Sequence, residues 1–186
     1  MTERPLRADA RRNRDRLLEV AREAFAAEGL AVPLDEIARR AGVGPGTLYR
    51  HFPTKEALFE AVVEDRLRAL ADVARALRSA TDPGVALFTL IDRLAAEAAV
   101  KKDLVDALDS AGVEVRTSLA ATATDLRDEI AHLLARAQHD GAVRPDLDIA
   151  DLMALLSGLF TALTAPAHRR ADPARALAVL RAGLRP

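Results

Sequence analysis

The stretch LDEIARRAGVGPGTLYRHF, residues 34–52, decides the fold of this chain. It reads as two short helices joined by a three-residue turn, the first over about 34–41 and the second ended by Pro53. The small side chain of Ala38 lets the two helices cross closely, and Gly42 relieves the turn between them. This pattern predicts a helix-turn-helix, a motif whose second helix leaves one face free for the major groove of DNA.

Polar side chains occupy the face of the second predicted helix that the core leaves free. Val43 and Leu48 turn back toward the first helix, and Phe52 is expected to wedge into the core. The exposed set consists of Thr47, Tyr49, Arg50, His51 and, one turn later, Lys55. A generic helical hairpin would share the apolar residues but has no reason to expose these anion-binding groups together. For Tyr49, the one tyrosine of the chain, the alternative is a packed ring with its hydroxyl in water.

Helical patterns continue on both sides of this motif. Residues 11–28 carry one apolar stripe, which ends at Gly29 and consists of Leu17, Leu18, Ala21, Ala24 and Phe25. Thr54 is expected to cap a long helix that runs to about residue 80. Five more helices are expected near 83–99, 102–111, 113–139, 148–164 and 173–184, and aspartates precede three of them: Asp82, Asp148 and Asp172. The prediction is an all-α fold of nine helices, which an aromatic content of 3% also favours.

Positive charge is concentrated at the N-terminus. The formal net charge is −1, yet residues 1–16 carry six arginines against three acidic residues, whereas residues 57–186 carry 16 basic against 19 acidic side chains. The six arginines are Arg4, Arg7, Arg11, Arg12, Arg14 and Arg16. Such an arm can face the phosphates of a nucleic acid, and a solvated tail is the alternative.

Composition excludes several kinds of chemistry. The chain has no cysteine, so disulfides and thiolate metal sites are impossible. No apolar stretch approaches the roughly 18 residues of a membrane span, and no secretion signal is visible, which fits a cytoplasmic protein without a membrane partner. Half of the residues are hydrophobic, so the chain can bury a sizeable core.

Three further patterns resemble ligand sites but lack essential partners. The glycines at 42, 44 and 46 follow no strand and precede no Gly-Lys-Ser/Thr, so they do not indicate a nucleotide loop. Glu129 and His132 have the Glu-x-x-His spacing of di-iron bundles, but the sequence holds a single copy. His132 and His139 lie about 10 Å apart along a helix, too far to share one metal. We expect no cofactor, no metal and no catalytic centre.

The segment GVGPGTLYRHFPTKEALFEAV, residues 42–63, resembles the signature of the TetR family of transcriptional regulators almost position for position. The resemblance is strong from the first helix to the start of the fourth. Beyond it, the helix count and the segment QHDGAVRPDLD, residues 138–148, are similar in general character. It implies a nine-helix TetR-like fold with a DNA-binding domain at 1–56 and a ligand-binding and dimerisation domain at 57–186.

The resemblance also implies roles for individual residues. Those expected to contact DNA phosphates are Thr47, Tyr49, His51 and Lys55. Those expected to lie against base edges are Pro45, Gly46 and Arg50, and Gly44 adjoins them in the DNA-facing set. Arg50 could instead take a phosphate, although its guanidinium fork suits guanine. The chain departs from the family pattern before the first short helix, where Val32 and Pro33 replace the common phosphate-binding Ser or Thr.

The C-terminal helices carry more apolar surface than packing within a monomer needs. Residues 148–164 and 173–184 are expected to form a four-helix interface with a second subunit through Leu152, Leu155, Leu159, Leu163, Leu177 and Leu180. An ordinary buried core helix is the alternative. A homodimer would place two recognition helices about one DNA turn (~34 Å) apart, so that they read a palindrome.

A cavity for an unknown small-molecule effector is expected among the helices after the DNA-binding domain. Its candidate lining residues are Phe88, Leu108, Leu126, Leu133, Met153 and Phe160, each with a plain core position as the alternative. These expectations describe a repressor that binds a palindromic double-stranded DNA operator as a homodimer and is released by its effector. A helical protein-interaction module is the second hypothesis, and an enzyme is the third.

Overall fold

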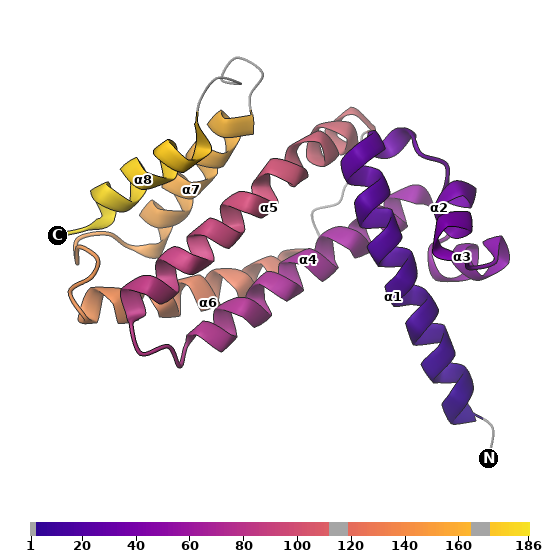
Figure 1. Ribbon diagram of the computed structural model, residues 1–186, viewed down its shortest axis with the longest axis horizontal. Helices are drawn as coiled ribbons and strands as arrows, with labels where there is room; N and C mark the ends of the chain where they lie inside the picture. Colours follow the sequence, from indigo (N-terminus) through magenta and orange to yellow (C-terminus); the bar gives the residue numbers. More distant parts are fainter. Residues whose placement is uncertain (1–2, 112–118, 165–171) are drawn as a thin grey trace. The chain divides into compact units, whose positions relative to one another are not determined.

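The chain folds entirely into helices over the residues that the structure describes (Figure 1). The structure is a computed structural model; it describes the backbone of residues 3–111, 119–164 and 172–186, and the side chains of 9–97, 119–163 and 172–186. Eight α-helices and one 3-10 helix occupy these ranges: α1 (Glu3–Glu28), η1 (Gly29–Ala31), α2 (Leu34–Ala41), α3 (Pro45–His51), α4 (Lys55–Leu77), α5 (Pro83–Ala111), α6 (Ala120–His139), α7 (Ile149–Thr164) and α8 (Pro173–Leu184). The predicted all-α class is confirmed.

The helices form two compact units. The first comprises Met1–Arg66 and Asp103–Ala120, and the second comprises Leu67–Lys102 and Ala121–Pro186. Helices α4 and α5 are each divided between the units: the first part of α4 and the last part of α5 belong to the first unit, and the remaining parts belong to the second. Each unit has its own buried core, because the apolar stripes of its helices face one another.

The core of the first unit is built around α1. Its inward stripe is fully buried, as predicted, and consists of Leu17, Leu18, Ala21, Ala24 and Phe25. The ring of Phe25 meets the ring of Phe59 of α4 edge to face, with centroids 5.9 Å apart. Gly29 ends α1 with φ of +67°, the left-handed conformation expected for it.

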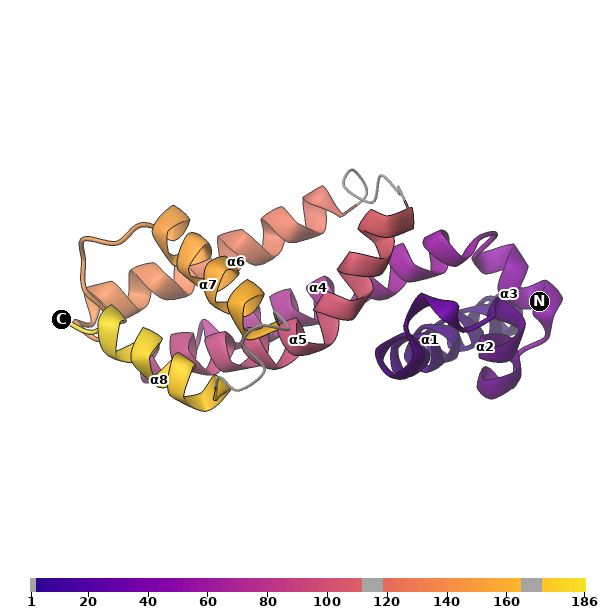
Figure 2. The same cartoon turned by 90° about the horizontal axis from the view of Figure 1, so that it is seen from above.

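The core of the second unit gathers the end of α4, the start of α5, and α6, α7 and α8, seen from two directions in Figures 1 and 2. One carboxylate lies inside it: Glu129 of α6 is 3% exposed. Arg78, directly after α4, donates to Glu129 at 2.6 Å, and Arg75 of α4 lies 3.2 Å from the other oxygen of Glu129. Arg136 of α6 also donates to the carbonyl of Ala80 at 3.0 Å. These contacts fix the C-terminal end of α4 to α6.

Helix ends follow the capping residues that the sequence indicates. Thr54 Oγ1 accepts from the amide of Ala57 at 3.1 Å, and Asp82 accepts from the amide of Val85 at 2.8 Å. Asp148 and Asp172 accept equivalent bonds at the starts of α7 and α8, at 2.9 and 3.0 Å. These side chains satisfy amides that have no partner within their helices.

The helix boundaries differ from the prediction in three places. The segments 83–99 and 102–111 form the single helix α5, because no glycine or proline interrupts the chain between them, and this reduces the nine expected α-helices to eight in the described ranges. Helix α1 begins at Glu3, eight residues before the expected start at 11. The expected helix 113–139 is seen from Ala120, and its first residues lie outside the described part. Within that part no helix combines the length and apolar character of a membrane span.

Candidate nucleic-acid interface

The turn between α2 and α3 has the geometry that the helix-turn-helix pattern predicts. Gly42 adopts φ of +63°, and its amide donates to the carbonyl of Arg39 at 3.1 Å. The amide of Val43 donates to the carbonyl of Ala38 at 3.0 Å, so the end of α2 is capped by the turn itself. A side chain at Gly42 would be strained and would lie 3.2 Å from the guanidinium of Arg16. The backbone conformation therefore favours glycine, whereas the flexible end of Arg16 would have to move by only a few tenths of an ångström.

Buried apolar side chains fix the orientation of α3. Those of the motif are Ile37, Ala38, Ala41, Val43, Leu48 and Phe52, of which Val43 is the most exposed at 7%. Because Leu48 and Phe52 occupy the inward side of α3, the rest of this short helix faces away from the core. The predicted wedge position of Phe52 is confirmed.

The residues expected at DNA lie together on or beside the outward face of α3. Tyr49 is 44% exposed, Arg50 is exposed, and Thr47 and His51 are half-buried. The start of the helix is exposed at Gly44, Pro45 and Gly46. Lys55, half-buried, begins α4 after the short loop that follows α3. Neither Tyr49 nor His51 is enclosed by protein, so the face remains open to a ligand.

Tyr49 already has a partner within the protein. Its hydroxyl makes a hydrogen bond to the carboxylate of Asp35 in the first turn of α2, and this bond raises the pKa of Tyr49 above its ordinary value of 10.0. A tyrosine hydroxyl has a single proton to donate. The proton cannot serve Asp35 and a phosphate at the same time.

Lys55 is also held internally. Its Nζ donates to the carbonyl of Leu30 at 2.8 Å, which joins the start of α4 to the segment between α1 and α2. An ammonium group has three N–H donors, so two remain for other acceptors. Lys55 is thus fixed in place and still able to bind an anion.

An ionic network stiffens α2. Glu36 accepts from Arg39 at 2.8 Å and from Arg40 at 2.7 Å, and Arg40 also pairs with Glu28 at the end of α1. The two arginine hydrogen bonds lower the pKa of Glu36 from 4.5 to about 2. The charges of Arg39 and Arg40 are therefore largely compensated by Glu36 and Glu28. Arg50, on α3, is not part of this network. The spacing of Glu36, Arg39 and Arg40 along one helix was the signal in the sequence for this network.

A second basic residue adjoins the end of α3. The guanidinium carbon of Arg14, on α1, lies 5.7 Å from the centroid of the Phe52 ring. Sequence reasoning assigned Arg14 only to a general basic arm. The contact places the N-terminal half of α1 next to the predicted DNA-facing helix.

The six leucines expected at a dimer interface do not share one environment. Leu152 is fully buried in the core of the second unit, and its role at a dimer interface stays a prediction. Leu155 is 45% exposed, and Leu159 and Leu163 are half-buried. Leu177 and Leu180 of α8 are half-buried against the same core. The exposed apolar surface is thus formed by the other side of α7 and by α8, where Val179 is 68% exposed.

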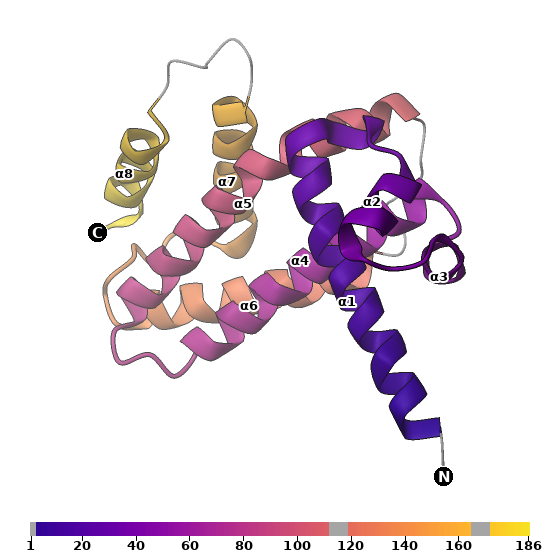
Figure 3. The same ribbon diagram turned by 45° about the vertical axis from the view of Figure 1, so that its right-hand side comes forward.

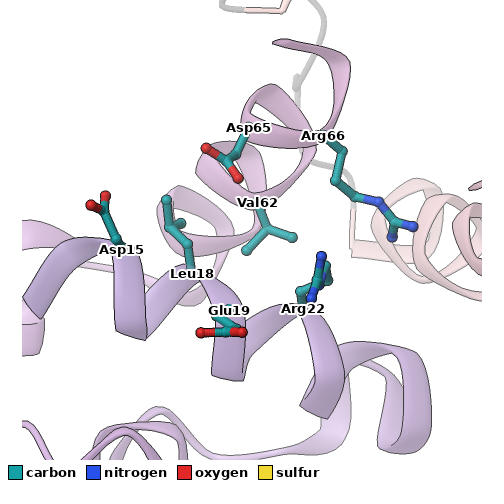
Figure 4. A pocket seen from close by; sticks show the side chains of 7 residues that line it. All are labelled: Asp15, Leu18, Glu19, Arg22, Val62, Asp65 and Arg66. Carbon is teal, nitrogen blue, oxygen red and sulfur yellow. The ribbon is translucent and has the colours of Figure 1, made fainter. Parts of the chain in front are cut away.

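The residues expected to line an effector cavity belong to the core of the second unit. Leu126 and Leu133 are buried in it, and Phe88, Met153 and Phe160 pack against it. The side chain of Leu108 lies outside the described residues. A groove of about 280 Å³ lies elsewhere, in the first unit between α1 and α4. Figure 4 shows the apolar side chains of Leu18 and Val62 near the centre of this groove, with charged side chains around them: Asp15, Glu19, Arg22, Asp65 and Arg66.

Comparison with known proteins identifies the family. Residues 17–62 match the profile of bacterial regulatory proteins of the tetR family, and residues 82–186 match the C-terminal domain of SbtR-like transcriptional regulators. The chain belongs to the TetR family. It is a DNA-binding transcriptional regulator rather than an enzyme, and the TetR resemblance of residues 42–63 is confirmed.

Similarity to other TetR-family proteins extends over most of the chain. A TetR transcription regulatory protein from Mycobacterium vanbaalenii is 47% identical, with a TM-score of 0.80 and coverage of 98% of this chain and 100% of that chain. The regulator SCO0520 from Streptomyces coelicolor is 33% identical, with a TM-score of 0.76 and coverage of 93% and 98%. The transcriptional repressor KstR2 of Mycolicibacterium smegmatis is 32% identical over 149 residues, which are 73% of this chain and 70% of that protein.

Proposed function

We propose that this TetR-family regulator is a repressor that binds a palindromic operator as a homodimer and dissociates when a small effector binds. The observation that carries the proposal is the open face of α3, where Tyr49 and Arg50 are exposed above a core fixed by Leu48 and Phe52. A helix presented in this way fits the major groove. The similar protein KstR2 is named a transcriptional repressor, which supports repression rather than activation.

Each residue of the face has a role set by its donors. Thr47, Tyr49, His51 and Lys55 supply hydroxyl, imidazole and ammonium donors to phosphate oxygens. Gly44, Pro45 and Gly46 let the backbone approach the bases closely, and Arg50 offers a bidentate fork to guanine. With few side chains at the start of α3, Arg50 carries most of the direct base reading.

The homodimer buries the exposed side of α7 and α8. Leu155 and Val179 are large apolar side chains that water surrounds in the single chain, and small residues beside them, including Gly158, permit close helix approach. Leu155→Arg should convert the dimer to monomers in sedimentation analysis. Val85→Arg is the matched control, because Val85 is 61% exposed on α5 and lies outside this surface. Equal dissociation of both variants, or of neither, would contradict the interface.

Release of the operator by an effector requires that the protein has two arrangements and that the effector binds them with different affinities. Helix α4 carries Lys55 at its start, and its end is fixed to α6 through Glu129. A ligand among the helices of the second unit that displaces α4 would change the position of Lys55 and of the neighbouring α3. A coupling of ~1–3 kcal/mol would change operator occupancy about 5–150-fold.

The proposal is tested by fluorescence anisotropy with labelled duplexes that contain near-palindromes from DNA flanking the coding gene. We expect nanomolar, sequence-dependent binding that weakens steeply as salt increases, because several phosphates are neutralised. Absence of binding to every duplex, at low as well as moderate salt, would instead support a helical protein-interaction module.

A further inference from the structure

A single stripe runs the whole length of α1. Arg4, Arg7, Arg11 and Arg14 are spaced by three, four and three residues, and the same spacing continues to Leu18, Ala21 and Phe25. Positions three and four residues apart lie on one face of a helix. The second half of this stripe is buried in the core of the first unit. Its first half consists of arginines.

The arginine half of the stripe extends beyond the core. Figures 1 and 3 both show the N-terminal half of α1 projecting past α2 and α3. Arg14 marks the transition, because it is half-buried and its guanidinium lies over the ring of Phe52 at the end of α3. Arg14 thus joins α1 to the end of α3, and the helix backbone of α1 continues beyond this contact to Glu3.

Arg11 and its neighbour Arg12 differ in their surroundings. Arg12 forms an ion pair with Asp9, three residues earlier on another face of the helix. Arg11 is exposed, and among the described residues it forms no ion pair or hydrogen bond. The charge of Arg12 is thus compensated within the helix, whereas the charge of its neighbour Arg11 is available to a ligand.

We propose that the N-terminal half of α1 is a second DNA-contacting element, a helical extension whose stripe Arg4, Arg7, Arg11 and Arg14 follows the phosphates beside the groove entered by α3. The proposal rests on the proposed function. Ten residues of helix span about 15 Å, the axial length of about four phosphates on one strand. The stripe carries four positive charges at the helical period and no acidic residue, so it matches a linear array of phosphates. It contributes affinity without base preference.

Adjacent arginines provide the test. Binding of the wild type, Arg11→Gln and Arg12→Gln to an operator duplex is measured by anisotropy across a series of salt concentrations. Both substitutions remove one positive charge from exposed neighbours on α1. A difference between the two variants therefore cannot come from net charge. We expect Arg11→Gln to reduce the slope of log K against log salt by about 1, and Arg7→Gln/Arg11→Gln by about 2, with the preference for the operator unchanged. Arg12→Gln should leave the slope close to that of the wild type.

A fourth variant tests the helix itself. Ala10→Pro retains every arginine but breaks α1 between Arg7 and Arg11, and we expect it to reduce the slope as the double variant does. Equal effects of Arg11→Gln and Arg12→Gln, or unchanged binding by Ala10→Pro, would overturn the helical stripe while leaving the proposed function intact. If the wild type binds no duplex, the proposed function fails first, and the same titrations reveal this. Circular dichroism confirms that the rest of each variant is folded.

Discussion

The ammonium of Lys55 lies 2.8 Å from the carbonyl oxygen of Leu30, a residue 25 positions earlier in the chain. The bond fixes the first residue of α4 to the connection between α1 and α2. A residue expected to bind DNA therefore also supports the structure of the DNA-binding unit. Substitution at this position should change both properties, and the two effects can be measured separately.

Lys55→Met should lower the free energy of unfolding by about 1 kcal/mol, because the partly buried carbonyl of Leu30 loses its donor. It should also weaken binding to all duplexes and reduce the salt slope by about 1. Urea denaturation and anisotropy measure the two effects. Arg93→Gln, an exposed cation on α5 in the second unit, is the control and should change neither. Normal salt dependence in Lys55→Met would remove Lys55 from the phosphate contacts.

Tyr49 can be titrated optically without interference, because the chain has one tyrosine and no tryptophan. The hydrogen bond to Asp35 should place the pKa of Tyr49 above 10.0 in an absorbance titration, and Asp35→Asn should lower it toward that value. Glu23→Gln, an exposed carboxylate farther along α1, should leave the pKa unchanged. A pKa unaffected by Asp35→Asn would mean that the hydroxyl does not bind Asp35.

The same hydrogen bond affects DNA binding. Tyr49→Phe should weaken binding to all duplexes if the hydroxyl donates to a phosphate. Asp35→Asn should then strengthen binding, because it removes both the competing acceptor and a negative charge near the DNA. Combining the two substitutions should abolish the part of this gain that depends on the hydroxyl. A gain that is fully retained in the double variant would assign the effect to charge alone.

Arg50→Ala distinguishes base reading from phosphate binding. If Arg50 binds guanine, the variant should lose preference at one base pair of each half-site, at a cost of about 1–3 kcal/mol. Anisotropy with a set of single-substituted operators measures this preference. Uniform weakening across the set, with a reduced salt slope, would make Arg50 a phosphate ligand.

The ionic network of α2 predicts a dependence of stability on pH. The pKa of Glu36 is about 2 in the folded protein against 4.5 ordinarily, so its contribution is present above pH 4.5 and is lost as the pH falls toward 2. Glu36→Gln should therefore flatten the decrease in melting temperature over this range. Glu23→Gln is again the control, since Glu23 makes no ion pair with the described residues. Parallel curves for Glu36→Gln and the wild type would contradict the network.

The buried carboxylate of Glu129 should be important for stability. Glu129→Ala should lower the free energy of unfolding by about 2 kcal/mol, since it removes a hydrogen bond from Arg78 and an ion pair with Arg75, and both arginines are partly in water. Asp125→Asn, at an exposed carboxylate bound to the same Arg75, should cost less than about 1 kcal/mol. Chemical denaturation measures both, and equal losses would show that burial of Glu129 contributes nothing.

The sequence by itself determined the features that depend on near neighbours in the chain. The turn at Gly42, the caps at Thr54, Asp82, Asp148 and Asp172, and the inward positions of Leu48 and Phe52 were all predictable. A cap or turn is decided within about four residues, and a buried stripe by helical periodicity. The TetR resemblance followed from the same local segment.

Tertiary structure alone decided which side chains meet across the fold. The bond from Lys55 to Leu30, the contact of Arg14 with Phe52 and the pairing of Glu129 with Arg78 join residues 25, 38 and 51 positions apart. The apolar pattern of α7 likewise could not separate buried Leu152 from exposed Leu155, because nearly every side of that helix carries apolar or small residues. Such partners depend on how whole helices pack, and packing is a property of all their faces together rather than of any one segment.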